Sequence, residues 1–203
     1  MLTSPGATAA ASRLGPYGLR TRVARMLGRL PLVPVDDAPE LLAPPVAAAL
    51  RTWPRAGDVQ VAAIDPDLAD TAAFCAAYGV APGAAANCVV VVGKRGEVVR
   101  YAACVVLATT RADVNGAVRR YLDVRKASFG PREDVVAATA MEFGGITPVG
   151  LPADWPVLVD AAVLEQPLVV IGSGLRRSKL VLPGAALAEL PGAQVLPGLG
   201  QPT

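Results

Sequence analysis

Short apolar runs, each about the length of a β-strand, follow one another from Asp58 onward and alternate with helical segments. The most apolar of them, residues 101–108, is far shorter than the roughly 18 residues that a membrane-spanning helix needs. Residues 93–96 close a hairpin between two of these strands. Strands are expected at 59–64, 88–92, 97–109, 126–129, 157–160, 168–171 and 179–182, with helices after Asp65, Asp113 and Pro131 and near 185–190. This order predicts a mixed α/β fold, a twisted mixed β-sheet surrounded by helices.

Composition separates the first 57 residues from the rest of the chain. Residues 1–12 are rich in Ala, Thr, Ser and Gly and are expected to be disordered. Residues 19–30 carry apolar side chains at helical spacing, with arginines mostly on the other faces, which predicts an amphipathic helix. Prolines punctuate residues 31–45 and indicate a connector. We therefore expect an N-terminal helical extension over 1–57 and the main domain over 58–203.

The absence of histidine restricts the chemistry that this chain can perform. It excludes Ser-His-Asp and Cys-His nucleophile systems and the usual zinc ligand sets, so no metal or other cofactor is predicted. Cys75, Cys88 and Cys104 form no CxxC pair, and their odd number argues against a disulfide framework. We expect reduced, non-catalytic thiols in a cytoplasmic protein.

Residues 144–150, with the sequence Gly-Gly-Ile-Thr-Pro-Val-Gly, form the most informative segment. The glycines allow a tight turn and a close approach of the backbone to a ligand. N–H groups of such a loop can hold a carbonyl oxygen or an oxyanion, which makes Gly144 and Gly145 candidate catalytic residues. A sharp turn between a helix and a strand, without any ligand, explains the same pattern.

Further candidates lie on either side of this loop. Gly172-Ser173-Gly174 follows an apolar strand, where ligands often bind, although an ordinary hairpin turn has the same composition. Arg176 and Arg177 beside it suit a phosphate or a solvated turn. Asp160 ends another apolar strand and either anchors a loop or faces a pocket.

Taken together, these segments resemble the YbaK/EbsC family, which includes the insertion domain of prolyl-tRNA synthetase. Residues 144–150 resemble its GG-[IV]-[ST]-P-x-G loop, and residues 126–129 with the following helix are similar to its lysine-bearing strand and helix. Residues 157–160 look like its apolar strand that ends in Asp, and Gly172 to Gly174 with Arg176 are similar to its late glycine turn. The resemblance covers residue 58 to about 195 and implies a YbaK-like fold.

The resemblance implies hydrolysis of mischarged aminoacyl-tRNA, of the tRNA-Pro type, by a freestanding editing enzyme. Backbone N–H groups near Gly144, Gly145 and Gly174 would polarise the ester carbonyl, and a positioned water would attack. The substrate-binding residues carried over are Asn87, Lys126, Thr147, Pro148, Asp160, Gly172, Ser173 and Arg176. The expected partners are the aminoacylated 3′ end of tRNA and an aminoacyl-tRNA synthetase, with no membrane, for a monomer or weak dimer.

One position departs from the family pattern. Most members carry a lysine just before the strand at 88–92, implicated in holding the tRNA 3′ end, where this chain has Asn87. Asn is uncharged and cannot make the same phosphate contact, which leaves three alternatives: Lys126 or Arg176 compensates, the substrate differs, or activity is reduced or lost. Two hypotheses therefore stay open: an active deacylase, favoured by the intact glycine loop, and an inactive module that binds tRNA or nucleotides, favoured by Asn87.

Two further expectations concern individual segments. A valine at Gly145 should block the substrate and abolish deacylation with a modest loss of stability. The helix at 19–30 packs on the main domain, contacts the tRNA backbone through its arginines, or is a transit peptide. Packing would bury Leu19, Val23, Met26 and Leu30 and leave Arg20, Arg22 and Arg29 exposed.

Overall fold

The computed structural model describes residues 27–202, which form a mixed α/β fold as expected. The strands are β1 (Leu32–Pro34), β2 (Gln60–Ala63), β3 (Ala86–Arg95), β4 (Val98–Leu107), β5 (Thr110–Ala112), β6 (Lys126–Phe129), β7 (Val157–Asp160), β8 (Val169–Gly172), β9 (Ser178–Leu182), β10 (Ala193–Leu196) and β11 (Gly200–Pro202). The α-helices are α2 (Pro44–Leu50), α3 (Thr71–Tyr78), α4 (Arg119–Tyr121), α5 (Arg132–Thr139) and α6 (Ala161–Leu164). Several single turns of 3₁₀ helix join them, and a short π-helix, Val114–Val118, leads into α4.

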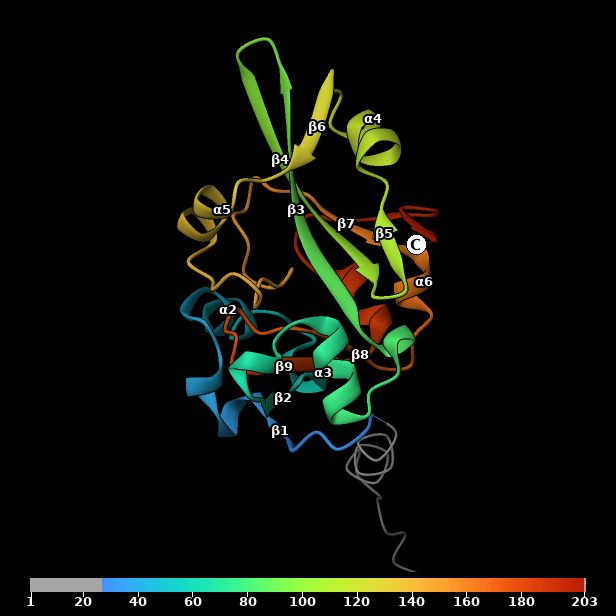
Figure 1. Cartoon of the computed structure of the whole chain (residues 1–203). Coiled ribbons are helices and arrows are strands. Elements are labelled where there is room, and N and C mark those ends of the chain that lie inside the picture. The colour runs from blue at the N-terminus through green and yellow to red at the C-terminus, as the bar shows by residue number, and fades with distance from the viewer. Residues whose placement is uncertain (1–26, 203) are drawn as a thin grey trace, which may run out of the picture.

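The strands divide over three sheets (Figure 1). One sheet has the order β1-β2-β9-β8 and is antiparallel throughout. The second has the order β10-β7-β4-β3-β6 and is mixed, because β7 runs parallel to both β4 and β10. The third pairs β11 with β5. A single parallel bridge between Ala85 and Val170 joins the four-stranded sheet to the start of β3, and we call this junction the seam.

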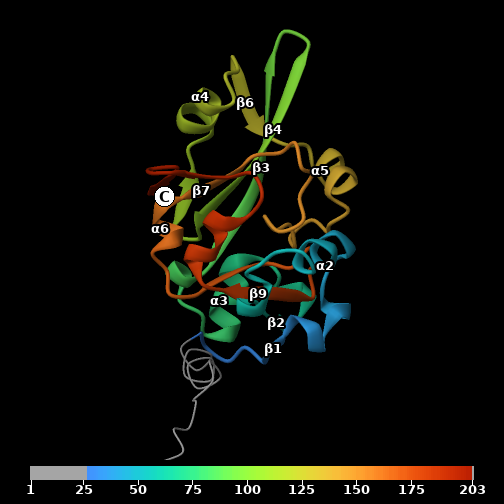
Figure 2. The ribbon, with the colours of Figure 1, turned by 180° about the vertical axis from the view of Figure 1, so that it is seen from behind.

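Both views of the ribbon place the four-stranded sheet and the tip of the β3–β4 hairpin at opposite ends of the molecule (Figure 1, Figure 2). The four-stranded sheet, α2 and α3 lie at one end. The tip of the β3–β4 hairpin projects from the other end, beside β6 and α4. The two long strands of that hairpin pair over their full length and connect the two ends.

Local chemistry sets the helix boundaries. Asp70 caps α3, since its Oδ1 accepts hydrogen bonds from the N–H groups of Ala72 and Ala73. Gly79 ends the same helix in the left-handed conformation with φ of 67°, as its position in the sequence predicts. Asp113 caps the helical segment that starts at Val114, as the sequence predicts, and its two side-chain oxygens accept from the N–H groups of Gly116 and Ala117; that segment begins as a π-helix.

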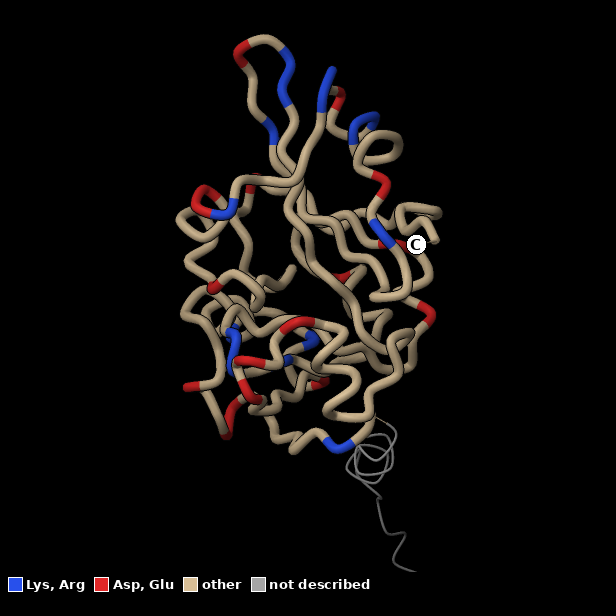
Figure 3. The backbone as a smooth tube through the Cα atoms, in the orientation of Figure 1, with Lys and Arg blue, Asp and Glu red and all other residues tan. Residues whose placement is uncertain are grey.

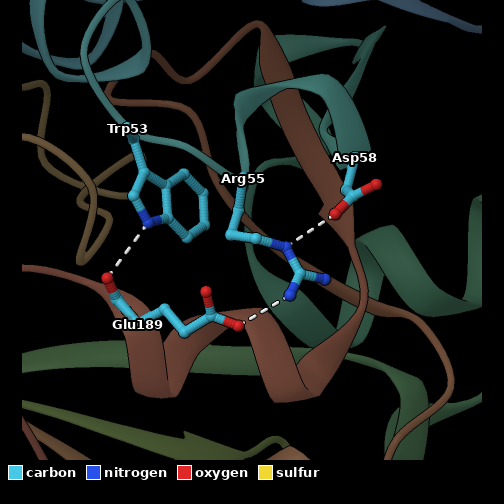
Figure 4. Close-up of polar contacts among 4 residues, drawn as sticks. All are labelled: Trp53, Arg55, Asp58 and Glu189. Carbon is cyan, nitrogen blue, oxygen red and sulfur yellow. Dashed lines mark hydrogen bonds and ion pairs between the residues drawn. The ribbon is translucent and has the colours of Figure 1, made fainter.

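The residues on both sides of the expected boundary at position 58 pack into one core. Leu42, Val46 and Trp53 belong to the same buried cluster as Val105 and Leu180. Figure 4 shows how Trp53 and its neighbours are tied to the segment Gly184–Glu189. The indole N–H of Trp53 donates to the backbone oxygen of Glu189 at 3.1 Å. Arg55 joins the carboxylates of Asp58 and Glu189 at 2.7 and 2.6 Å.

Most of the expected helix at 19–30 lies outside the described residues, Leu19, Val23, Met26, Arg20 and Arg22 included. Residues 27–30 form a turn instead of a helix. Within it, Leu30 is buried and Arg29 is exposed, as expected from the sequence. Arg29 donates through its backbone N–H to the Tyr78 oxygen at 2.8 Å, so this turn is fastened to the end of α3.

Shortening Leu30 tests this contact. Leu30→Ala is expected to lower the free energy of unfolding by about 2–3 kcal/mol, because Leu30 belongs to the buried cluster around Phe74. Denaturant unfolding of the full chain measures the change. The control Val195→Ala, at a side chain that is 42% exposed, should shift it by less than about 0.5 kcal/mol. Equal effects of the two substitutions would show that the turn does not pack as described.

Within residues 27–202, no helix combines the length and the hydropathy needed to cross a bilayer. The same residues contain no group of three or more Cys, Asp or Glu side chains placed to hold a metal ion.

Candidate active site

A cavity of about 1010 Å³ takes its walls from both larger sheets. The start of β3 forms one wall, the end of β8 and Lys179 of β9 form another, and the first turns of α3 form a third. The glycine loop contributes Gly144 and Ile146. Two large apolar side chains of the lining, Phe129 and Phe143, are 62% and 49% exposed.

The structure brings the two glycine segments together, although they are about thirty residues apart in the sequence. The N–H of Gly174 donates to the oxygen of Gly145 at 2.7 Å. A Cβ atom at Gly172 would lie 2.3 Å from that same oxygen, so only glycine permits this approach. Gly144, with φ of 91°, and Gly172 line the cavity, whereas Gly145 and Gly174 lie behind them.

This packing decides which N–H groups are available to a ligand. The N–H of Gly145 donates to Glu142 at 2.9 Å, and that of Gly174 is used by Gly145. Two of the three amides proposed from the sequence as donors to the ester carbonyl, those of Gly145 and Gly174, are therefore occupied. The N–H of Gly144 donates to no acceptor within the described part of the chain, and Gly144 lines the cavity.

Asn87 lies in the cavity wall, one residue into β3. Its side-chain oxygen accepts a hydrogen bond of 2.6 Å from the hydroxyl of Thr71, at the start of α3. The oxygen of the carboxamide is thereby fixed, and its NH₂ group keeps two donors without a partner in residues 27–202.

Lys179 is a cation in the cavity wall that none of the sequence motifs indicated. Its side chain is 7% exposed, and its Nζ donates to the oxygen of Ala69 at 3.0 Å and lies 5.5 Å from the centre of the Phe74 ring. None of the carboxylates in residues 27–202 forms an ion pair with it. Burial, together with the positive charge of Arg176, lowers the pKa of Lys179.

One short segment positions both polar groups. Ala69 accepts the hydrogen bond from Lys179, and Thr71, two residues later, donates to Asn87. Asp70 stands between them and caps α3 through its Oδ1. Residues 69–71, which lead into α3, thus hold the ammonium of Lys179 and the carboxamide of Asn87 at the same cavity.

Two sequence candidates lie away from the cavity. Lys126 is exposed and pairs with Lys94 near the tip of the hairpin, because β6 runs outward from the cavity and brings only its last residue, Phe129, to the wall. Asp160 is buried and caps α6 by accepting from Ala162 at 2.9 Å. Its other oxygen accepts from Gly200 at 2.6 Å, so of the two possibilities it anchors a loop.

The remaining candidates support the loop from behind. Ser173 is fully buried, with its hydroxyl 2.7 Å from that of Ser178. Thr147 and Pro148 are buried outside the cavity lining, and the Thr147 hydroxyl has no hydrogen-bond partner in the described residues. Arg176 is held by the backbone oxygens of Pro66 and Phe143, at 2.9 and 3.3 Å, and lines a smaller hollow beside the cavity.

The sequence contained a signal for Lys179. Only three lysines occur in the chain, and Lys179 alone stands inside a strand whose every residue is buried. A lysine within an apolar strand is rarely buried without a partner or a function.

The thiols are expected to be inert. Burial raises the pKa of Cys104 to about 12 and also raises the pKa of Cys88, so neither forms a thiolate near neutral pH. Cys88→Ala is expected to keep the ligand affinity and any hydrolytic activity of the protein within about twofold, although Cys88 lines the cavity. Cys104→Ala, at a buried site outside the lining, is the matched control. Loss of activity in the Cys88 variant alone would contradict this prediction.

Comparisons with known proteins agree with this geometry. The model of the aminoacyl-tRNA editing domain family matches residues 65–190, well over half of the chain. A solved structure described as a candidate trans-editing enzyme for prolyl-tRNA synthetase is 26% identical, with a TM-score of 0.66 over 78% of this chain and 96% of that chain. A structure from a study that grafted epitopes onto scaffold proteins is also 26% identical, with a TM-score of 0.65 over 78% and 97%.

A protein described only as hypothetical shares the fold at 21% identity, with a TM-score of 0.65 over 75% of this chain and 99% of that chain. A comparison with curated protein sequences finds no match. The match of the family model confirms the resemblance that the glycine motifs indicated. The chain therefore belongs to the aminoacyl-tRNA editing domain family.

Proposed function

We propose that this protein is a freestanding deacylase that hydrolyses the ester bond of mischarged aminoacyl-tRNA in the cytoplasm. The observation that carries the proposal is the meeting of Gly144, Gly172 and Asn87 at one cavity in a member of the editing family. The cavity of about 1010 Å³ has room for a terminal adenosine and an attached amino acid.

The reaction needs little from the protein because the aminoacyl ester is already activated. Water forms a bond to the ester carbonyl carbon, the bond from that carbon to the ribose oxygen breaks, and a proton passes to the ribose oxygen. The adjacent ribose hydroxyl can carry that proton. The N–H of Gly144 stabilises the negative charge that develops on the carbonyl oxygen, a role that the sequence indicated for Gly144, Gly145 and Gly174 together.

Asn87 and Lys179 hold the other part of the substrate. Lys179 supplies the positive charge that Asn87 lacks, and its ammonium binds the phosphate of the terminal nucleotide, while the NH₂ group of Asn87 donates to a neighbouring oxygen. Lys126 and Arg176 are less suited to this role. The first lies away from the cavity, and the guanidinium of the second is already bound by two backbone oxygens.

The relatives support a proposal for the class of substrate. A protein that shares 26% of its residues with this chain is described as acting in trans for prolyl-tRNA synthetase, which supports tRNA of the proline type and a synthetase as a transient partner.

Of the residues that line the cavity, Asp70 is the one carboxylate, and one of its oxygens caps α3. We therefore assign no general base, metal or other cofactor.

A deacylation assay tests the proposal. Purified protein is mixed with tRNA-Pro and with other tRNAs, each charged with a non-cognate amino acid, and release of the amino acid is measured against spontaneous hydrolysis. Accelerated release from at least one mischarged tRNA is expected. Tight binding of tRNA without release would instead support an inactive binding module, which the uncharged Asn87 favours. Neither binding nor release would exclude both functions.

A further inference from the structure

We propose that the end of the molecule opposite the four-stranded sheet docks the duplex backbone of the RNA whose 3′ end enters the cavity. We call this surface the basic lobe and define it by Lys94, Arg95, Arg100, Arg119, Arg120, Arg125 and Lys126. These residues lie near the tip of the β3–β4 hairpin, in α4 and at the start of β6, and all are exposed. The inference rests on the proposed function and adds a second contact area to it.

Charge is strongly segregated along the chain. Residues 94–126 contain eight Lys or Arg and three Asp or Glu, whereas residues 27–93 and 127–202 contain seven and fourteen. Figure 3 shows the basic segments gathered around the hairpin, β6 and α4. A molecule with a net charge of only +2 therefore presents one strongly positive end, which attracts a polyanion from a distance.

The lobe also contains a repulsive contact. Lys94 in β3 and Lys126 in β6 are directly paired across the two strands. Like charges in such positions destabilise a sheet, and no acidic side chain forms an ion pair with either lysine in the described residues. An arrangement that costs stability in the free protein is relieved when each of the two ammonium groups contacts a phosphate.

The arginines of the basic lobe are positioned by their neighbours but keep most of their positive charge. Arg95 and Arg100 both approach Asp123, which offsets one charge and fixes the two guanidinium groups beside each other. Arg119, Arg120 and Arg125 form no ion pair with a carboxylate in the described residues. Their charges stay available to a ligand.

Strand β6 connects the basic lobe to the cavity. It begins at Lys126 in the lobe and ends at Phe129 in the cavity wall, a distance of about 10 Å for three steps along a strand. Phe129 and Phe143 expose about half or more of their surfaces beside the cavity. Exposed aromatic rings at the mouth of a cavity provide stacking surfaces for unpaired bases.

These observations favour RNA over other polyanions. The cavity takes the terminal nucleotide, the phenylalanines stack on unpaired bases next to it, and the basic lobe meets phosphates farther along the backbone. An anionic membrane would use the positive charge of the lobe but would leave the cavity and the aromatic rings unused.

Salt dependence of RNA binding tests the basic lobe. Uncharged tRNA labelled with a fluorophore is titrated with the full chain at several salt concentrations, so that hydrolysis plays no part. The double variant K94Q/K126Q is expected to bind about tenfold more weakly at low salt. Its slope of log K against log salt should be smaller by about 1.8, because two contacts to the phosphates of a duplex are lost.

A matched pair of arginines provides the control. R119Q lies in the basic lobe and is expected to weaken binding, whereas R51Q, beside α2 at the opposite end, should bind like the wild type. The melting temperature of K94Q/K126Q should stay equal or rise, because a like-charge contact is removed. An unchanged salt slope in K94Q/K126Q would overturn the proposal, and so would a loss of binding to phosphatidylserine vesicles without a loss of binding to RNA.

The outcome separates this inference from the proposed function. If the wild type deacylates and the lobe variants bind tRNA normally, the proposed RNA-docking role of the basic lobe is wrong and the proposed deacylase function is supported. If no charged tRNA is hydrolysed but the lobe variants lose RNA binding, the RNA-docking role of the basic lobe is supported and the proposed deacylase function is wrong. In an active enzyme the lobe variants should raise KM for full-length tRNA and leave hydrolysis of an aminoacyl-adenosine ester unchanged.

Discussion

Replacing Lys179 with methionine is expected to lower kcat/KM for deacylation by about 100-fold, which corresponds to about 2.7 kcal/mol of lost transition-state stabilisation. A hydrogen bond to a charged group contributes about 1.5–3 kcal/mol, so one lost contact to phosphate accounts for the change. Methionine keeps most of the volume of the side chain and removes a buried charge that has one hydrogen bond, to Ala69. The variant should therefore fold about as stably as the wild type.

A matched pair of substrates distinguishes a binding role of Lys179 from a structural one. Aminoacyl-adenosine esters with and without a 5′-phosphate are compared in the wild type and in Lys179→Met. The 100-fold loss should appear with the phosphate and disappear without it, because the ammonium then has no partner to lose. A similar loss with both esters would contradict the assignment of Lys179 to the phosphate.

The lowered pKa of Lys179 predicts how kcat/KM and the free energy of unfolding depend on pH. The ammonium loses its proton at a lower pH than a solvated lysine, so the phosphate-dependent part of kcat/KM should fall as the pH rises through that lowered pKa. The unfolded chain binds more protons than the folded one between the lowered pKa and 10.5, so the free energy of unfolding should increase with pH in that window. Lys179→Met should lack both effects.

Replacing Gly145 with valine is expected to abolish activity and to lower the free energy of unfolding by about 3 kcal/mol or more. A Cβ atom at Gly145 would lie 2.5 Å from the carbonyl carbon of Leu175, and backbone cannot move aside as a side chain can. The sequence suggested a modest loss of stability, because a side chain added at Gly145 was expected to point toward the substrate. In the structure it faces the glycine turn.

Gly83→Val is the matched control for this substitution, because no atom lies within 4 Å of the position that a Cβ would take at Gly83. It should change the free energy of unfolding by less than about 1 kcal/mol. Denaturant unfolding of both variants gives the comparison. A fully stable Gly145→Val protein would show that the loop does not pack on Leu175, and normal hydrolysis by it would remove the loop from the mechanism.

Features that depend on neighbouring residues could be predicted from the sequence. The end of α3 at Gly79 and the strand from Lys126 to Phe129 appear where expected, because capping and alternation act within a few residues. The strands β1, β5, β10 and β11 were not predicted. Each has three or four residues and is defined by a partner far away in the chain, such as Ala62 for Leu32.

The candidate site divides in the same way. Glycine density alone located the loop at 144–150, but the identity of the available N–H group depends on Gly174, about thirty residues later. Lys126 was selected for its place in a motif, whereas Lys179 reaches the cavity only because β9 is covered on both sides. Position in a sequence does not reveal the direction in which a strand leaves a cavity.

The seam between the two larger sheets has a consequence for how the selectivity of this protein for an amino acid can change. The cavity takes walls from both sheets, and a single bridge from Ala85 to Val170 joins them there. The width available to an amino acid is thus set by the relative placement of two sheets as well as by the side chains that touch it. Ala85 and Val170 themselves line the cavity, so a substitution at the seam can change selectivity by moving one sheet against the other as well as by changing a side chain that the substrate meets.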